Sequence, residues 1–156
     1  MIIKYPDPTV LKFTVPGKPQ GKERARNNSK GKKPYKPEKT RAYEEDVRWE
    51  YIRACKTSVF ADGEAIFMQV VAYYPVPTRA NKAEKAAMLA CDQYPICKPD
   101  ADNVLKIIAD ALNKLAYNDD AQITTASVTK LFSENPRVEV SLGIDFGRRV
   151  DNVNAY

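Results

Sequence analysis

The segment Lys98-Pro-Asp-Ala-Asp-Asn-Val-Leu-Lys-Ile-Ile-Ala-Asp-Ala-Leu-Asn113 carries the clearest helical pattern of this 156-residue chain. A helix turns by about 100° per residue, so a helix over residues 102–115 separates two kinds of side chain. The apolar ones share one side: Val104, Ile108, Ala111 and Leu115. The polar ones share the opposite side, extended to residue 117: Asp102, Lys106, Asp110, Asn113 and Tyr117. The apolar side predicts a packing face, and the polar side is left for chemistry.

Two more helical patterns and four strand patterns surround this segment. Residues 39–57 and 81–90 predict helices. The strands are predicted at residues 10–15, 64–74, 121–132 and 137–146. The nearly unbroken apolar run of the second strand is typical of a central strand covered on both faces, and the last two strands predict a hairpin. We therefore expect a single α/β domain of the α+β kind, with a mixed sheet of about four strands flanked by helices.

Positive charge is concentrated in one part of the chain. The protein has 25 lysines and arginines, 20 aspartates and glutamates, and a formal net charge of +5. Residues 18–41 hold ten of the basic residues and only two of the acidic ones, so the remainder is net negative. Prolines and glycines within residues 16–37 predict a long basic loop, and the polar residues 147–156 predict a frayed tail. Such concentrated charge is typical of a protein that binds an anionic polymer.

Histidine is absent, which excludes catalytic triads and dyads that need an imidazole base. Any catalysis therefore depends on carboxylates, lysines and a metal ion. The cysteines Cys55, Cys91 and Cys97 form no CxxC pair and lack a histidine to complete a zinc site, so we expect reduced thiols in a cytoplasmic protein. No apolar stretch predicts a signal peptide or a membrane span.

Two aspartates lie at the start of the helical segment and two follow it. Pro99 disfavours a helical conformation of the residue before it, so Asp100 and Asp102 are expected on an extended start, where alternate side chains point the same way. Asp119 and Asp120 precede the next strand, which could bring Asp120 back beside the first pair. Converging carboxylates suit Mg²⁺ or Mn²⁺, ions that assist phosphodiester hydrolysis.

A structural interpretation of the same residues stands beside this one. Asp100 or Asp102 would then cap the helix, and Lys106 would only form ion pairs one turn away on the helix. Asp119 and Asp120 would be turn residues. The pattern alone does not choose between these interpretations.

The residue identities in this segment indicate a protein family more specifically than the spacing of its aspartates does. It resembles the signature of the RusA family of Holliday junction resolvases in four ordered parts: the Lys98-Pro-Asp-Ala-Asp-Asn103 start, Lys106 one turn on, the Asp110-Ala-Leu-Asn113 helix end, and Asp119-Asp-Ala-Gln122 before a strand. The stretch Val15-Pro-Gly-Lys-Pro-Gln-Gly-Lys-Glu-Arg-Ala-Arg26 resembles the family's basic segment. The likeness covers residues 10–146, although the lysine-rich loop over residues 21–37 departs from the family pattern.

This resemblance implies a small homodimeric nuclease, often carried by prophages, that cuts four-way DNA junctions symmetrically with Mg²⁺. It places the family's catalytic aspartates on Asp100, Asp102 and Asp120, and its essential lysine on Lys106. Asp119 belongs to the signature as the less certain metal ligand. A bacterial or phage-encoded cytoplasmic enzyme of recombination and repair follows as an expectation.

The basic loop is predicted to contact the phosphates of DNA arms. The residues expected to do so are Lys18, Lys22, Arg24, Arg26, Lys30, Lys32, Lys33 and Lys36. A two-fold symmetric dimer would place one site on each of two opposed strands, with Trp49, Tyr73 or Tyr74 at the interface or, equally, in the core. Two alternatives stay open: a non-catalytic DNA-binding protein, and another metal-dependent phosphoryl-transfer enzyme acting on nucleotides, although no glycine-rich phosphate loop is present.

Overall fold

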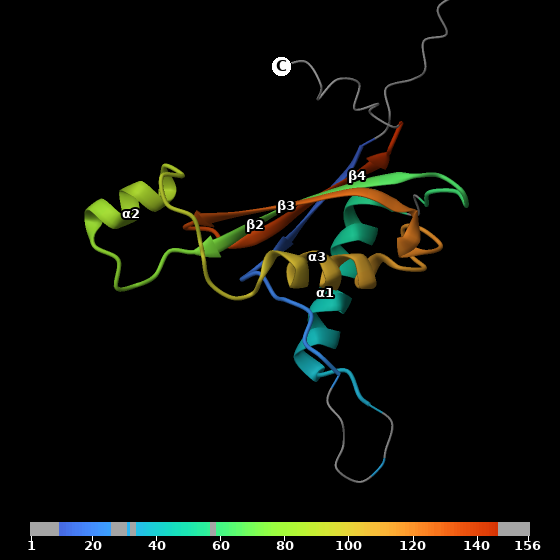
Figure 1. Ribbon diagram of the computed structural model, residues 1–156, viewed down its shortest axis with the longest axis horizontal. Coiled ribbons are helices and arrows are strands. Elements are labelled where there is room, and N and C mark those ends of the chain that lie inside the picture. The colour runs from blue at the N-terminus through green and yellow to red at the C-terminus, as the bar shows by residue number, and fades with distance from the viewer. Residues whose placement is uncertain (1–9, 26–30, 32–33, 57–58, 147–156) are drawn as a thin grey trace, which may run out of the picture.

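A four-stranded mixed sheet with two helices packed on one face forms the structure, a computed structural model that describes residues 10–25, 31, 34–56 and 59–146 (Figure 1). The elements are β1 (Leu11–Pro16), α1 (Glu38–Cys55), β2 (Ile66–Pro75), α2 (Lys82–Leu89), α3 (Ala101–Leu112), a 3₁₀ turn (Asp120–Gln122), β3 (Ile123–Ser133) and β4 (Arg137–Ile144). The expected single α+β domain is confirmed. The predicted tail at residues 147–156 lies outside the described residues.

The strand order is β1-β4-β2-β3, so the predicted hairpin of the last two strands is wrong. Strand β3 pairs in parallel with β2, whereas β4 is antiparallel to both β1 and β2. One row of the sheet shows the arrangement, with Phe13, Val140, Val70 and Val128 side by side. This order places the most apolar strand, β2, between two neighbours, which a hairpin of β3 and β4 would not require.

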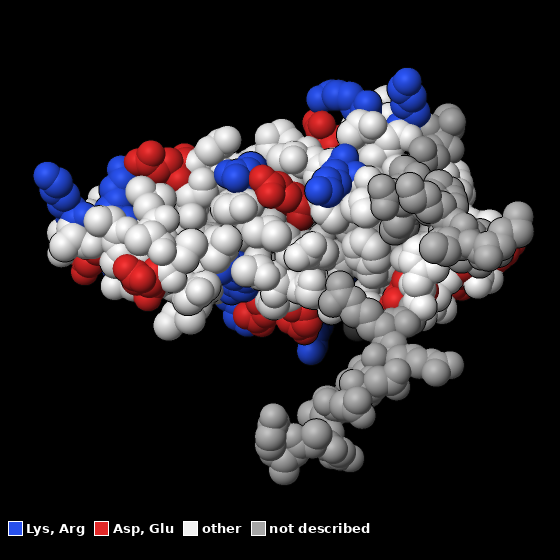
Figure 2. Space-filling model, turned by 90° about the horizontal axis from the view of Figure 1, so that it is seen from above, with Lys and Arg blue, Asp and Glu red and all other residues white. Residues whose placement is uncertain are grey.

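Helices α1 and α3 cover one face of the sheet (Figure 1). Burial along β2 alternates: Met68 and Val70 are buried beneath the helices, whereas Gln69 is exposed and Val71 is half-buried. The expectation that this strand is covered on both faces is therefore wrong for the described residues. On the uncovered face, seen from above in Figure 2, the described residues carry scattered charges of both signs.

Helix α3 buries the predicted apolar side, including Val104 and Ile108. It ends at Leu112, earlier than predicted, because Asn113 has extended backbone angles and Lys114 has a positive φ of 65°. Tyr117 is therefore not on the helix. Its side chain is buried, and its hydroxyl donates a hydrogen bond to the Ala109 carbonyl at 2.8 Å. No described helix has the length and apolarity needed to cross a membrane.

Candidate active site

Asp100 lies on the expected extended start of α3, but Asp102 does not, because the helix already begins at Ala101. Asp100 has extended backbone angles (φ −70°, ψ 154°) and precedes the first helical residue. Its side chain accepts no capping hydrogen bond from the helix and instead forms an ion pair with Lys98. Asp102 lies in the first turn and is exposed. The carboxylate of Asp100 is therefore not used to cap the helix.

The 3₁₀ turn before β3 gives the two neighbouring aspartates different surroundings. Asp119 accepts a hydrogen bond from the Ala121 amide at 2.8 Å and caps the turn. This backbone hydrogen bond lowers the pKa of the Asp119 carboxyl. Gln122 completes the cap and also donates to the carbonyls of Ala61 and Glu64, which ties the turn to the start of β2. The side chains of Asp119 and Gln122 thus fix the turn, and the Asp120 carboxylate takes no part in the cap.

Lys106 joins α3 to this turn. Its Nζ lies 3.0 Å from Oδ1 of Asp110 and 3.5 Å from Oδ2 of Asp120. The hydrogen bond with Asp110, reinforced by the charges of both aspartates, raises the pKa of Lys106 despite partial burial. The lysine therefore stays protonated at neutral pH. The structure thus places the predicted Lys106 beside the predicted Asp120, from segments that only the fold brings together.

The sequence did not predict a network of ion pairs that extends from Asp110, the partner of Lys106, to α1. Lys22 Nζ lies 2.7 Å from both Asp110 Oδ2 and Glu44 Oε1, and Lys36 Nζ lies 2.5 Å from Glu44 Oε2. Burial alone would raise the pKa of Asp110, but the hydrogen bonds from Lys22 and Lys106 outweigh it and lower the pKa. Burial would likewise lower the pKa of Lys22, but Asp110 and Glu44 raise it. Glu44 is buried between apolar positions of α1, and that break in the apolar stripe was the available signal.

The basic loop rests on the start of α3. The Lys22 amide donates to the Asn103 carbonyl at 2.9 Å. A side chain at Gly21 would bring a Cβ to 2.7 Å from that of Pro99, so only glycine allows this approach. Beside the contact is a hollow of about 330 Å³, whose lining includes Lys18, Lys39, Lys98, Asp100 and Asn103. Lysines from three segments thus line the same hollow as Asp100.

The eight predicted phosphate contacts divide into three groups. Lys18 and Arg24 lie in the described part of the loop, and Lys18 borders the hollow. Lys22 and Lys36 form ion pairs with Glu44 on α1. The remaining four fall outside the described residues: Arg26, Lys30, Lys32 and Lys33.

Comparison with known proteins identifies the family. The family Endodeoxyribonuclease RusA matches residues 16–143, which include α3, the 3₁₀ turn and both sets of aspartates. This chain belongs to the RusA endodeoxyribonuclease family. A relative from Bacillus subtilis (strain 168), "Uncharacterized protein YqaN", is 33% identical over 141 residues, covering 85% of this chain and 94% of that protein.

Membership in the RusA family makes this chain a Holliday junction endonuclease, an enzyme that hydrolyses phosphodiester bonds in branched DNA. The resemblance seen in the sequence is thereby confirmed. RusA nucleases generally need a divalent metal ion. Asp100, Asp102 and Asp120 offer the oxygen donors that a hard cation prefers.

The candidate metal ligands have suitable donor atoms, but they are not gathered into one group in the structure. Among the described residues, no group of three or more acidic or cysteine side chains is close enough to hold a metal ion. Lys98 and Lys106 instead contact Asp100 and Asp120. The donor set thus fits a divalent cation in kind, and the ligand assignment stays a prediction.

Proposed function

We propose that this chain is a Mg²⁺-dependent endonuclease, with Mn²⁺ as a substitute, that resolves four-way DNA junctions by symmetric hydrolysis. Asp100, Asp102 and Asp120 are the proposed metal ligands, and Lys106 is the proposed catalytic cation. The observation that supports this most directly is the position of Lys106, 3.0 Å from Asp110 and 3.5 Å from Asp120. It connects the helix that carries two of the aspartates to the turn that carries the third.

The chain's own residues perform three tasks in this proposal. Lys106 keeps its proton because Asp110 raises its pKa, and it can therefore stabilise negative charge that develops on the phosphate. Asp110 and Lys22 hold that ammonium group in place. Lys18, Arg24, Lys39 and Lys98 position the DNA backbone. A bound divalent cation supplies Lewis-acid polarisation of the phosphodiester.

The proposed assembly is a two-fold symmetric dimer, because two opposed strands of a junction need two sites. Of the aromatic residues considered for its interface, Tyr74 is buried in the core, and Tyr73 stacks on Arg137 with the ring centroid 3.8 Å from Cζ. Trp49 is 65% exposed on α1 and is the remaining candidate. A bacterial or phage-encoded enzyme of recombination and repair, acting in the cytoplasm where its DNA lies, completes the proposal.

Junction cleavage tests the proposed chemistry. Purified protein should cut a synthetic four-way junction with Mg²⁺ and leave it intact with EDTA. Asp102→Asn should bind the junction without cutting it, whereas Asp46→Asn, which alters an exposed aspartate on α1, should cut at the wild-type rate. Cleavage by Asp102→Asn at the wild-type rate contradicts the mechanism. Binding without cleavage by the wild-type protein in both Mg²⁺ and Mn²⁺ supports the non-catalytic alternative, and tight binding of nucleotides without preference for branched DNA supports the nucleotide enzyme.

A further inference from the structure

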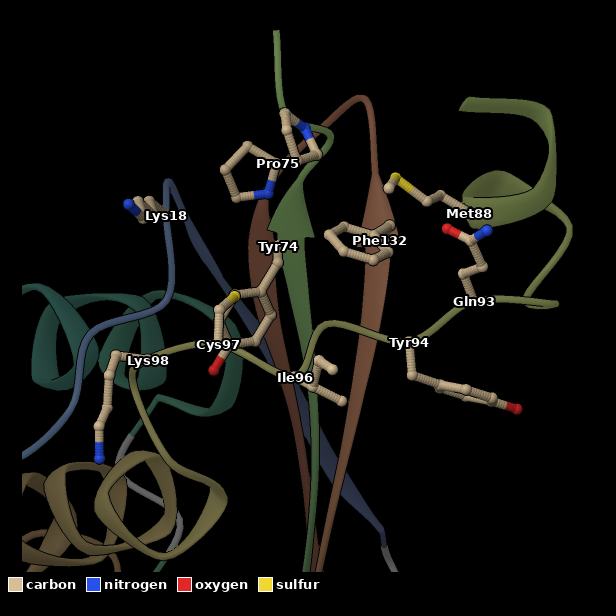
Figure 3. A pocket seen from close by; sticks show the side chains of 11 residues that line it. Lys18, Tyr74, Pro75, Met88, Gln93, Tyr94, Ile96, Cys97, Lys98 and Phe132 are labelled. Atoms are coloured by element: carbon tan, nitrogen blue, oxygen red, sulfur yellow. The ribbon is translucent and has the colours of Figure 1, made fainter. Parts of the chain in front are cut away.

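A second, larger hollow adjoins the lysine-lined one. It measures about 790 Å³ and lies between the ends of β2 and β3, helix α2 and the loop that leads to α3 (Figure 3). Its walls are largely apolar and include Tyr74, Pro75, Met88, Ile96 and Phe132. Its volume is in the range of pockets that bind small organic groups, about 300–1,000 Å³.

The loop that forms the floor of this pocket is anchored to the sheet. Lys130 on β3 donates to the Cys97 carbonyl at 2.6 Å, and the Tyr74 hydroxyl donates to the Pro99 carbonyl at 2.6 Å. The Lys130 Nζ also lies 4.8 Å from the centroid of the Tyr74 ring. The exposure of the loop's side chains therefore does not result from a loosely held backbone.

Ile96 projects from this anchored loop almost entirely into solvent. Its side chain is 98% exposed, and Tyr94, two residues earlier, is 57% exposed with its ring pointing away from the pocket (Figure 3). Large apolar side chains grouped around a pocket mark a surface that meets a partner. The chemistry around the pocket identifies the class of that partner.

Lys18 and Lys98 belong to the walls of both hollows. In Figure 3 they lie on the side of the pocket toward α3, while Met88 and Phe132 lie on the other side. A ligand with a negative group at these lysines can therefore place an apolar, flat group in the larger pocket. A nucleotide has this construction, with its phosphate on one side and its base on the other.

We propose that the larger pocket receives one unstacked nucleobase from the DNA strand whose phosphates lie along Lys18 and Lys98. The inference rests on the proposed function, because it takes the lysine-lined hollow to be a DNA path. The apolar walls offer contact with any base and little hydrogen-bond readout, so the site accepts bases without strong sequence preference. A base in a continuous duplex is held by its stacked neighbours, whereas unstacking takes less free energy where stacking is already interrupted. The pocket thus selects branched DNA over duplex DNA.

Fluorescence of 2-aminopurine tests this proposal. The base analogue is placed at successive positions around the branch point of a synthetic junction, and wild-type protein is added in EDTA so that no cleavage occurs. We expect a several-fold rise in fluorescence at one position, because the analogue brightens when it leaves the stack. Ile96→Ser should remove this rise and weaken junction binding by about fivefold or more, with duplex binding unchanged. Ile96→Leu should retain both properties.

A matched control is Leu89→Ser, which alters an exposed leucine on α2 that does not line the pocket. It should behave as wild type in both measurements. The proposal is overturned if no position brightens with wild-type protein, or if Ile96→Ser binds the junction as wild type does. It is also overturned if Ile96→Ser changes the oligomeric state in light scattering, since the pocket would then be a protein interface. Wild-type protein that cuts junctions without any brightening refutes this inference alone; wild-type protein that neither binds nor cuts them refutes the proposed function.

Discussion

Lys22 Nζ lies 2.7 Å from Oδ2 of Asp110, which links the basic loop to the third turn of α3. The other oxygen of the same carboxylate lies 3.0 Å from Lys106. One side chain therefore joins a segment predicted to meet DNA to the proposed catalytic lysine. Asp110 contacts no reacting atom in this arrangement, and we regard it as a positioning residue.

Asp110→Asn tests this role through the pH dependence of cleavage. The substitution removes the negative charge that is the main cause of the raised pKa of Lys106. We expect kcat/KM to fall by about tenfold to a hundredfold, and the alkaline limb of the pH–rate profile to move to lower pH. Asp110→Glu should restore part of the rate and the position of that limb. A lower rate with an unmoved alkaline limb would show that Asp110 only supports the fold.

The same carboxylate makes a contribution to stability that depends on pH. The pKa of Asp110 is lowered in the folded protein from its ordinary value of 3.8. Its contribution is therefore present above pH 3.8 and is lost as the pH falls through the lower folded-state pKa. We expect the difference in Tm between wild type and Asp110→Asn to be constant near neutral pH and to shrink below pH 3.8. Thermal unfolding between neutral pH and about pH 2 measures it, and a difference that does not shrink contradicts the assignment.

Asp119 and Asp120 should respond differently to the same substitution. Asp119→Asn keeps a side-chain oxygen that can accept the Ala121 amide, and asparagine is an effective cap. We expect its cleavage rate to stay within about twofold of wild type, because capping needs no charge. Asp120→Asn removes a proposed metal ligand and should lower the rate by a hundredfold or more, by analogy with the loss of an electrostatic group at other active sites. Equal losses in the two variants would contradict this division of roles.

Glu44 is expected to hold the basic loop against α1. Its carboxylate oxygens form ion pairs with the Nζ atoms of Lys22 and Lys36, at 2.7 and 2.5 Å, and its side chain is only 10% exposed. Lys22 keeps Asp110 as a second partner and Lys36 is 45% exposed, so Glu44→Gln leaves no unpaired buried charge. We expect it to lower the free energy of unfolding by about 1 kcal/mol, seen as a lower urea midpoint. Limited trypsin digestion should also cut faster after Lys22 and Arg24.

Glu45→Gln is the matched control for that experiment, because the neighbouring glutamate on α1 is exposed. It should change stability by less than about 0.5 kcal/mol, as surface substitutions usually do. Equal digestion rates in Glu44→Gln and Glu45→Gln would show that the ion pairs do not hold the loop.

Local sequence patterns determined the elements of this protein and part of its site. The helical repeat of Val104 and Ile108 fixed the buried side of α3, because the residues that share a helix side follow from its turn per residue alone. The predicted extended start before the helix is confirmed at Asp100 and wrong at Asp102, which lies in the first helical turn. The residue sequence around Asp100 and Asp120 indicated the family, which the comparison confirmed.

The tertiary structure decided which of these elements meet. The alternation of Val138 and Val140 is the same whether β4 pairs with β3 or with β2, so strand order depended on burying β2 between neighbours. The contact of Lys22 with Asp110 and Glu44 likewise has no local signature, because an ion pair is a relation in space between segments distant in the chain. The sequence by itself thus determined the chemical groups of the site, and only the fold decided which lysine holds which carboxylate.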